Sequence, residues 1–238
     1  MKNIYQEILN SKNRNEKLLA ILIDPDKIQL EQLDNLILKI NQSPATHVFV
    51  GGSFVETNQI DLIIQEIKLN CNLPILLFPG NPSQISAYAD GVLFLNLISG
   101  RNSDYLIEHQ VNAVPILEKT ALEVISTGYV LIASGKETAV ERISQTKPLN
   151  RNDIDYVCQT TKAGEYMGNK LIYLEAGSGA EKAIPLEMIK EVSKKLTIPL
   201  IIGGGIRSKI GIENAFKAGA DLVVIGTAFE NNANFFEE

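Results

Sequence analysis

Short, continuous runs of apolar residues recur along this chain, and each run ends in glycine, proline or a polar residue. Continuous runs are typical of parallel β-strands buried on both faces, whereas half-exposed strands alternate between apolar and polar residues. The pattern predicts strands at residues 18–23, 48–50, 74–78, 91–95, 129–133, 171–174, 200–202 and 222–225. Parallel strands need crossover connections, so the chain is constrained to an α/β fold.

Most of the segments between these strands have apolar residues at helical spacing. This spacing predicts helices at 1–10, 26–40, 57–69, 82–89, 103–109, 153–167, 185–196, 208–218 and 228–235. Asp26, with Gln29 as capping-box partner, fits the N-cap of the second helix. Residues 112–127 allow one strand and an irregular crossing. Residues 134–150 are expected to form a long loop with about one helical turn, of the kind that covers or binds a ligand.

Strands and helices alternate about eight times without a linker or a shift in composition. This organisation predicts a single (β/α)8 barrel over residues 1–238. An open, doubly wound sheet is the alternative, because the fourth and fifth strands have the weakest patterns. The nucleotide-binding version of that sheet is disfavoured, since no G-x-G-x-x-G motif follows the first strand.

Charge and cysteine content exclude several classes of protein. The formal net charge of −6 and the pI near 5.1 argue against a nucleic-acid or anionic-membrane surface. Cys71 and Cys158 have no partners at metal-ligand spacing, so buried, reduced thiols are expected. Residues 1–17 do not have the pattern of a signal peptide, and no apolar run approaches the ~18–20 residues of a membrane span. These features predict a soluble, cytoplasmic protein.

Polar and small residues follow the predicted strands, at the end where (β/α)8 barrels carry their active sites. Asp24 follows the first strand, Asn96 the fourth and Glu175 the sixth. Small residues that can admit a phosphate to the backbone follow strands six to eight: Gly177, Ser178, Gly179, Gly203, Gly204, Gly205, Gly226 and Thr227. This pattern predicts an acid beside a phosphate site at the carboxyl ends of strands six to eight. Tight turns with a solvated Glu175 are the alternative interpretation.

Asp24 is free to reach into the predicted site, because Asp26 is assigned to the helix cap. Mg²⁺ at Asp24 would take oxygen ligands and complete its shell with a substrate phosphate. Ser53, after the neighbouring strand, offers a second oxygen. The spacing of these residues alone leaves open the alternative that Asp24 binds no metal. Arg207 is interpreted as a surface ion-pair or helix-cap residue.

Five stretches of the chain together resemble the geranylgeranylglyceryl phosphate synthase family, which includes the bacterial heptaprenylglyceryl phosphate synthases. They are residues 22–27 (LIDPDK), 50–53 (VGGS), 173–179 (YLEAGSG), 202–207 (IGGGIR) and 225–227 (IGT). The resemblance covers almost the whole chain and implies the barrel fold. It places Mg²⁺ on Asp24 and Ser53. It places sn-glycerol 1-phosphate on Tyr173, Leu174, Glu175, Ala176, Gly177, Ser178, Gly179, Gly204, Gly205, Gly226 and Thr227.

The reaction that the resemblance implies is prenyl transfer from a long-chain prenyl diphosphate, with geranylgeranyl diphosphate favoured, to the hydroxyl of glycerol phosphate. Magnesium neutralises the departing diphosphate, and the hydroxyl attacks a cation-like allylic carbon to form an ether. Glu175 is the expected general base, and Tyr173 the residue that orients the glycerol. Some bacterial members carry a lysine two residues before the metal aspartate, where this chain has Leu22.

Other functions remain open at this point. The glycine loops fit another phosphate-substrate barrel enzyme equally well, for example of the indole-glycerol-phosphate or thiamine-phosphate synthase kind. A non-catalytic phosphate-binding barrel is a further alternative. Four apolar residues could line a prenyl groove but are interpreted mainly as core: Phe78, Pro79, Tyr88 and Leu97. Apolar outer helix positions predict a homo-oligomer, and release of a lipid product predicts transient membrane contact.

Overall fold

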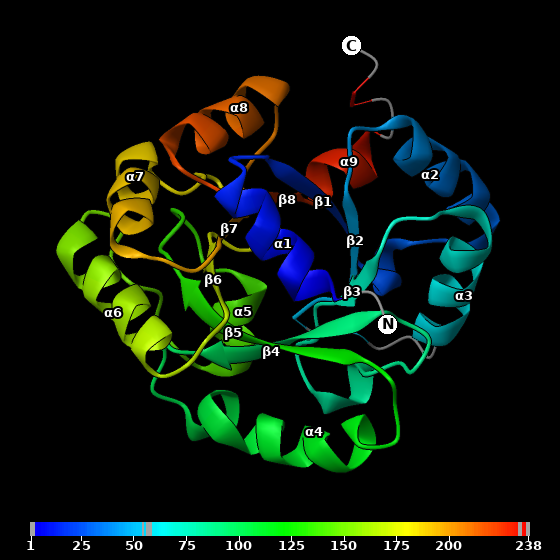
Figure 1. Cartoon of the computed structure of the whole chain (residues 1–238), viewed down its shortest axis with the longest axis horizontal. Coiled ribbons are helices and arrows are strands. Elements are labelled where there is room, and N and C mark those ends of the chain that lie inside the picture. Colours follow the sequence, from blue (N-terminus) through cyan, green and yellow to red (C-terminus); the bar gives the residue numbers. More distant parts are fainter. Residues whose placement is uncertain (1–2, 54, 56–58, 233–234, 237–238) are drawn as a thin grey trace.

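The computed structural model describes residues 3–53, 55, 59–232, 235 and 236. Within these residues, eight parallel strands close into a barrel in sequence order, because β1 pairs with β8 as well as with β2. Helices surround the barrel on its outer face (Figure 1). The predicted (β/α)8 architecture is therefore confirmed, and the open, doubly wound sheet is excluded.

The barrel wall and its helical layer have the following bounds. The strands are β1 (Leu18–Ile23), β2 (His47–Val50), β3 (Ile75–Leu77), β4 (Gly91–Leu97), β5 (Glu123–Leu131), β6 (Leu171–Glu175), β7 (Leu200–Gly203) and β8 (Leu222–Ile225). The helices are α1 (Ile4–Asn13), α2 (Leu30–Gln42), α3 (Ile60–Asn70), α4 (His109–Leu117), α5 (Ala139–Ser144), α6 (Ile154–Tyr166), α7 (Leu186–Lys195), α8 (Lys209–Ala218) and α9 (Thr227–Asn231). None of the helices that the structure describes is long and apolar enough to span a bilayer.

Apolar side chains pack on both sides of the barrel wall. Ala20 and Leu76 belong to a cluster inside the barrel. Their neighbours Ile21 and Leu77 belong to a second cluster between the strands and the helices. Because successive side chains of a strand point to opposite faces and both faces are buried, each strand has a continuous apolar sequence. This packing explains why the strands could be predicted from the sequence.

Helix α1 lies across one mouth of the barrel (Figure 1). Its residues Ile4 and Ile8 are fully buried in the interior cluster. Glu123, at the start of β5, accepts hydrogen bonds from the backbone N–H groups of Ile4 at 2.5 Å and Tyr5 at 3.0 Å. A helix leaves its first N–H groups without internal partners, so Glu123 caps α1 from a position far along the chain.

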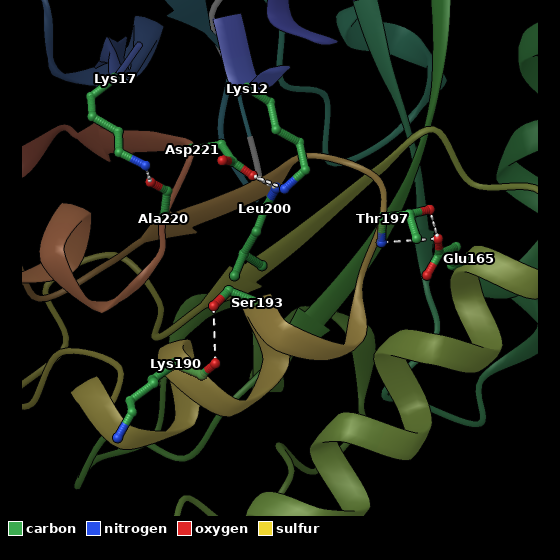
Figure 2. Close-up of polar contacts among 9 residues, drawn as sticks. All are labelled: Lys12, Lys17, Glu165, Lys190, Ser193, Thr197, Leu200, Ala220 and Asp221. Atoms are coloured by element: carbon green, nitrogen blue, oxygen red, sulfur yellow. Dashed lines mark hydrogen bonds and ion pairs between the residues drawn. The ribbon is translucent and has the colours of Figure 1, made fainter. Parts of the chain in front are cut away.

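The same end of the barrel is held together by Asp221, the residue before β8 (Figure 2). Its Oδ2 atom accepts hydrogen bonds from Lys12 Nζ of α1 and from Leu200 N of β7, each at 2.9 Å. Lys17 Nζ donates to Ala220 O at 3.0 Å. Asp221 is buried, and a buried carboxylate needs such partners. These bonds connect the first helix to the last two strands.

The middle of the chain differs from the prediction. Strand β5 begins at Glu123 rather than at residue 129, and α4 ends at Leu117, within a segment predicted to be irregular. The polar residues that concealed the first half of β5 have tertiary partners: Ser126 Oγ donates to Asn169 Oδ1 at 2.9 Å. Helix α4 contains Pro115, which disrupts the helical pattern. The predicted loop 134–150 contains α5 as its helical turn.

The segment after β1 also differs, because Asp26 is not the cap of α2. Asp24 accepts the N–H of Asp26 through Oδ1 at 3.2 Å and caps a 3-10 turn at Pro25–Lys27, and α2 begins only at Leu30. Since proline follows Asp24 directly, the chain turns at once and delays the helix. The start of the predicted helix 57–69 and part of the predicted helix 228–235 fall outside the described residues.

The connection from β3 to β4 also differs from the prediction. A helix is predicted at 82–89, but residues 78–90 contain only a 3-10 turn at Pro82–Gln84. The helical layer is therefore thin beside β4. Strand β4 extends to Leu97, so Asn96 lies within it, and its side-chain amide donates to Leu106 O of a π-helical turn at Asp104–Glu108.

Candidate active site

A cavity of about 840 Å³ opens at the carboxyl ends of the strands. Most of the residues predicted to form the site line it: Asp24, Ser53, Tyr173, Glu175, Gly177, Ser178, Gly179, Gly204, Gly205, Gly226 and Thr227. Leu174 and Ala176 do not, because both belong to the core between the strands and the helices. Asn96 does not line it either. Barrel closure thus brings together residues that are widely separated in the sequence.

Glu175 ends β6 and is buried, with 5% of its surface exposed. Its Oε1 atom accepts the backbone N–H of Gly177 at 2.6 Å. Burial raises the pKa of Glu175 from its ordinary value of 4.5 to about 7, although this hydrogen bond and the nearby Tyr173 oppose the rise. A carboxyl with a pKa near neutrality can accept a proton from a substrate and release it afterwards. The alternative interpretation, in which Glu175 is exposed to solvent, is therefore wrong.

Tyr173 lies in an aromatic group at the centre of the barrel. Its ring stacks on Phe78 at 5.3 Å and meets the edge of Tyr129 at 5.5 Å between ring centroids. The Tyr173 hydroxyl has no well-formed hydrogen bond to the described residues, but it lies near enough to Glu175 to lower the pKa of that carboxyl. Burial raises the pKa of both tyrosines well above the ordinary value. A neutral phenol is therefore available to a bound molecule beside Glu175.

Two glycines show why small residues are needed around Glu175. Gly204 has φ +81°, and a Cβ atom there would lie 2.3 Å from Glu175 Oε1. Gly177 has φ +98°, and a Cβ atom there would lie 2.3 Å from Thr138 Cγ2. Any side chain would be strained and would displace a neighbour. Only glycine therefore allows the turns after β6 and β7 to pack this closely against Glu175 and Thr138.

Lys136 stands beside the first of these turns. Its Nζ atom lies 3.8 Å from the position that a Cβ atom on Gly179 would occupy. Arg207 lines the cavity and donates to Ala180 O at 2.6 Å. It therefore supports the turn after β6, rather than forming the predicted ion pair or helix cap. Leu22 lines the cavity without a charge, so the cations here come from other elements.

Asp24 has a cationic neighbour that the sequence did not reveal. Lys27 Nζ lies 2.9 Å from Asp24 Oδ2 and 3.4 Å from Glu230 Oε2. Burial lowers the pKa of Lys27, but both carboxylates outweigh this effect and the pKa is raised. Burial also raises the pKa of Glu230. Two acidic side chains thus share one ammonium group at the cavity wall.

The carboxylate oxygens of this group are of the kind that a magnesium ion takes as ligands. Asp24 and Glu230 are oxygen donors, and both line the cavity with Ser53. Gly52 leaves space beside Asp24, because a Cβ atom on Gly52 would lie 3.5 Å from Asp24 Oδ1. The described residues contain no cluster of three or more His, Cys, Asp or Glu side chains placed to hold a metal. An ion at Asp24 would therefore take ligands from substrate oxygens, as Mg²⁺ commonly does.

A narrow apolar channel joins the cavity. Phe78, Pro79 and Leu97 line it, as considered from the sequence, whereas Tyr88 is exposed and does not. The channel and the cavity share six wall residues: Gly52, Ser53, Phe78, Tyr129, Val140 and Ile143. The channel passes along β4, beside the thin part of the helical layer. One end of a ligand can therefore lie in apolar surroundings while the other reaches Glu175.

The fold and this site define the class: a (β/α)8-barrel enzyme with a buried acid and glycine-rich turns at the carboxyl ends of the strands. The chain belongs to the PcrB family, whose sequence pattern matches residues 11–238. This places it among the geranylgeranylglyceryl phosphate synthases, as the ordered motifs indicate.

Individual relatives agree with this assignment. A geranylgeranylglyceryl phosphate synthase from Flavobacterium johnsoniae is 62% identical over 98% of this chain and 96% of that protein. One from Pyrococcus furiosus is 36% identical over 98% of this chain and 92% of that protein. The crystal structure of (S)-3-O-geranylgeranylglyceryl phosphate synthase from Thermoplasma acidophilum, in complex with its substrate sn-glycerol-1-phosphate, has a TM-score of 0.93. It is 30% identical, and the match covers 100% of this chain and 95% of that one.

Proposed function

We propose that this enzyme transfers a prenyl group, with geranylgeranyl as the favoured group, from its diphosphate to the free hydroxyl of sn-glycerol 1-phosphate. One observation carries the proposal: an apolar channel adjoins a more polar cavity beside a buried carboxyl whose pKa is about 7. A donor with an apolar chain and a charged head requires this combination. The relatives named for the same activity support it.

The acceptor belongs on the turns after β6 and β7. Gly179 and Gly205 line the cavity there, and Lys136 adds a positive charge beside Gly179. Phosphate binding by backbone N–H groups and a nearby cation is a common arrangement. The relative from Thermoplasma acidophilum binds sn-glycerol-1-phosphate. We therefore place the phosphate of the acceptor at these turns and its hydroxyl toward Glu175.

The donor belongs in the apolar channel, with its diphosphate at the wall residues that the channel and cavity share. Apolar side chains form most of the channel wall, including Phe78, Leu93 and Leu97, so the channel suits an apolar prenyl chain. Residues 78–90 and the segment around Tyr105 form one wall without a covering α-helix between β3 and β4. This wall is therefore not covered by an α-helix at residues 78–90.

Magnesium, when bound at Asp24 and Ser53, would neutralise the charge that develops on the departing diphosphate. The chain's own residues act on the acceptor. Tyr173 presents its phenol to the glycerol, and Glu175 Oε2 is the atom that receives the hydroxyl proton. The bond between the allylic carbon and the diphosphate oxygen breaks as the carbon–oxygen bond of the ether forms. The diphosphate carries away the electron pair, so atoms and charges balance.

The test is product formation from labelled sn-glycerol 1-phosphate with prenyl diphosphates of increasing length, with and without magnesium. We expect an ether lipid only with magnesium, and the best donor identifies the chain length. Glycerol phosphate binding without any product would overturn the proposal and favour a different phosphate-substrate enzyme or a binding protein. The cytoplasmic location, the homo-oligomer and the transient membrane contact remain predictions from the sequence.

A further inference from the structure

Helix α5 lies between the apolar channel and the more polar cavity. Val140 and Ile143 line both spaces, Ser144 lines only the channel, and Arg142 lines only the cavity. This short helix lies in the segment 134–150, which is predicted from the sequence to be a loop that covers or binds a ligand. Its side chains change from apolar to cationic where the channel meets the cavity.

Both ends of α5 are anchored, so the backbone that carries Arg142 is held in place. Thr138 and Glu141 form a capping box: Thr138 N donates to Glu141 Oε1 at 3.0 Å, and Glu141 N donates to Thr138 Oγ1 at 3.4 Å. At the other end, Asn102 Nδ2 donates to Ser144 O at 2.8 Å. Thr138 also packs against Gly177 in the turn after β6. The helix is thereby fastened to both the channel wall and the acceptor turn.

Arg142 differs from the other arginines of the chain. Arg14 pairs with Glu16, and the guanidinium groups of the remaining three donate to backbone carbonyls or to a tyrosine hydroxyl: Arg101, Arg151 and Arg207. Within the described part of the chain, the guanidinium of Arg142 has neither a hydrogen bond nor an ion pair. An arginine that projects into an enzyme cavity with all its donors free has its full capacity for an anionic ligand.

We propose that Arg142 binds the diphosphate of the prenyl donor. This inference rests on the proposed function. A guanidinium matches two phosphate oxygens at once, and its charge is permanent at physiological pH. The acceptor turn already has Lys136 beside it. Arg142 is instead flanked by Val140 and Ile143, which border the donor's channel. Its position therefore selects a donor that carries a diphosphate over a prenyl alcohol or monophosphate.

The experiment measures binding of inorganic pyrophosphate, with magnesium present, by calorimetry, together with the KM values of both substrates. Arg142→Gln should weaken pyrophosphate binding and raise the donor KM by about 10- to 100-fold, the effect of losing charge-assisted hydrogen bonds. The KM of sn-glycerol 1-phosphate should not change. Arg142→Lys should restore part of the loss. Lys147→Gln is the matched control, because Lys147 is exposed on the same segment and lines neither space.

The outcomes separate this inference from the proposed function. Unchanged pyrophosphate binding in Arg142→Gln, or a rise confined to the acceptor KM, overturns the role of Arg142. Loss of pyrophosphate binding in a protein whose wild type makes no ether lipid overturns the proposed reaction but supports Arg142 as the diphosphate ligand. Equal losses in Arg142→Gln and Lys147→Gln also overturn the role, since they would reflect only the net charge. Because Arg142 is exposed, its variants are expected to fold normally.

Discussion

Replacing Glu175 by glutamine tests both the chemistry and the burial of this side chain. Glutamine keeps the shape and can still accept the N–H of Gly177, but it cannot take a proton from the acceptor hydroxyl. General-base catalysis contributes about 10²–10⁴-fold, so turnover should fall by about that factor. In the wild type, kcat/KM should rise with pH and level off above about 7, the pKa that burial gives Glu175. The variant should lose this dependence.

The same substitution should stabilise the protein at alkaline pH. The pKa of Glu175 is raised from 4.5 to about 7 on folding, so the folded chain binds the proton more tightly than the unfolded chain. The contribution of Glu175 to stability is therefore full below about pH 4.5 and is lost as pH rises through about 7. A rise of this size corresponds to about 3 kcal/mol. Glu175→Gln should then raise the melting temperature by up to about 6–12 °C at pH 8 and by little at pH 4.5.

The assay combines calorimetric melting at both pH values with steady-state kinetics across the pH range. Glu181→Gln serves as the control, because Glu181 is an exposed glutamate a short distance along the chain and should change neither property. Wild-type turnover in Glu175→Gln would refute the role of base. An equal gain in melting temperature at both pH values would refute the argument that an ionised carboxyl is held in the interior.

Three further predictions concern single contacts. Asp24→Asn should raise the donor KM and weaken its dependence on magnesium, measured by titrating the ion at fixed substrate; unchanged dependence would contradict Asp24 as a ligand. Gly204→Ala should raise the KM of sn-glycerol 1-phosphate at least about tenfold and cost at least about 1 kcal/mol of stability, since φ is +81° and the new Cβ meets Glu175. Kinetics and thermal melting would show both effects, and a wild-type KM would count against the anion site. Glu123→Ala should cost about 1–2 kcal/mol by uncapping α1, seen in denaturant unfolding, with turnover unaffected; a loss of turnover at full stability would contradict this purely structural role.

The ends of the barrel strands could be predicted because burial on both faces leaves a clear signal. Strands β1 and β8 have the predicted bounds, since each is apolar throughout. Strand β5 could not be predicted in full, because Ser126 bonds to Asn169 and Glu123 caps α1. The sequence around a polar strand residue does not reveal the distant partner that satisfies it.

The same distinction applies to the candidate site. Residues at strand ends, such as Asp24 and Glu175, could be predicted because a parallel barrel gathers all carboxyl ends at one mouth. Lys27, Glu230 and Arg142 were missed, since they lie in a short turn and two short helices whose orientation depends on tertiary contacts. Arg142 carried one usable signal, a capping-box pattern within a long polar segment, with threonine at 138 and glutamate at 141.

The position of α1 has a consequence for the order in which the protein assembles. This helix is made early, but its N-terminal cap comes from Glu123 of β5, and Lys12 pairs with Asp221, just before β8. A chain that emerges from the ribosome therefore carries α1 without a docking site until the last strand appears. Any intermediate in which β8 has not yet joined β1 leaves Ile4 and Ile8 uncovered. Docking of α1 thus marks completion of the barrel, and protection of its amides from hydrogen exchange would report that event.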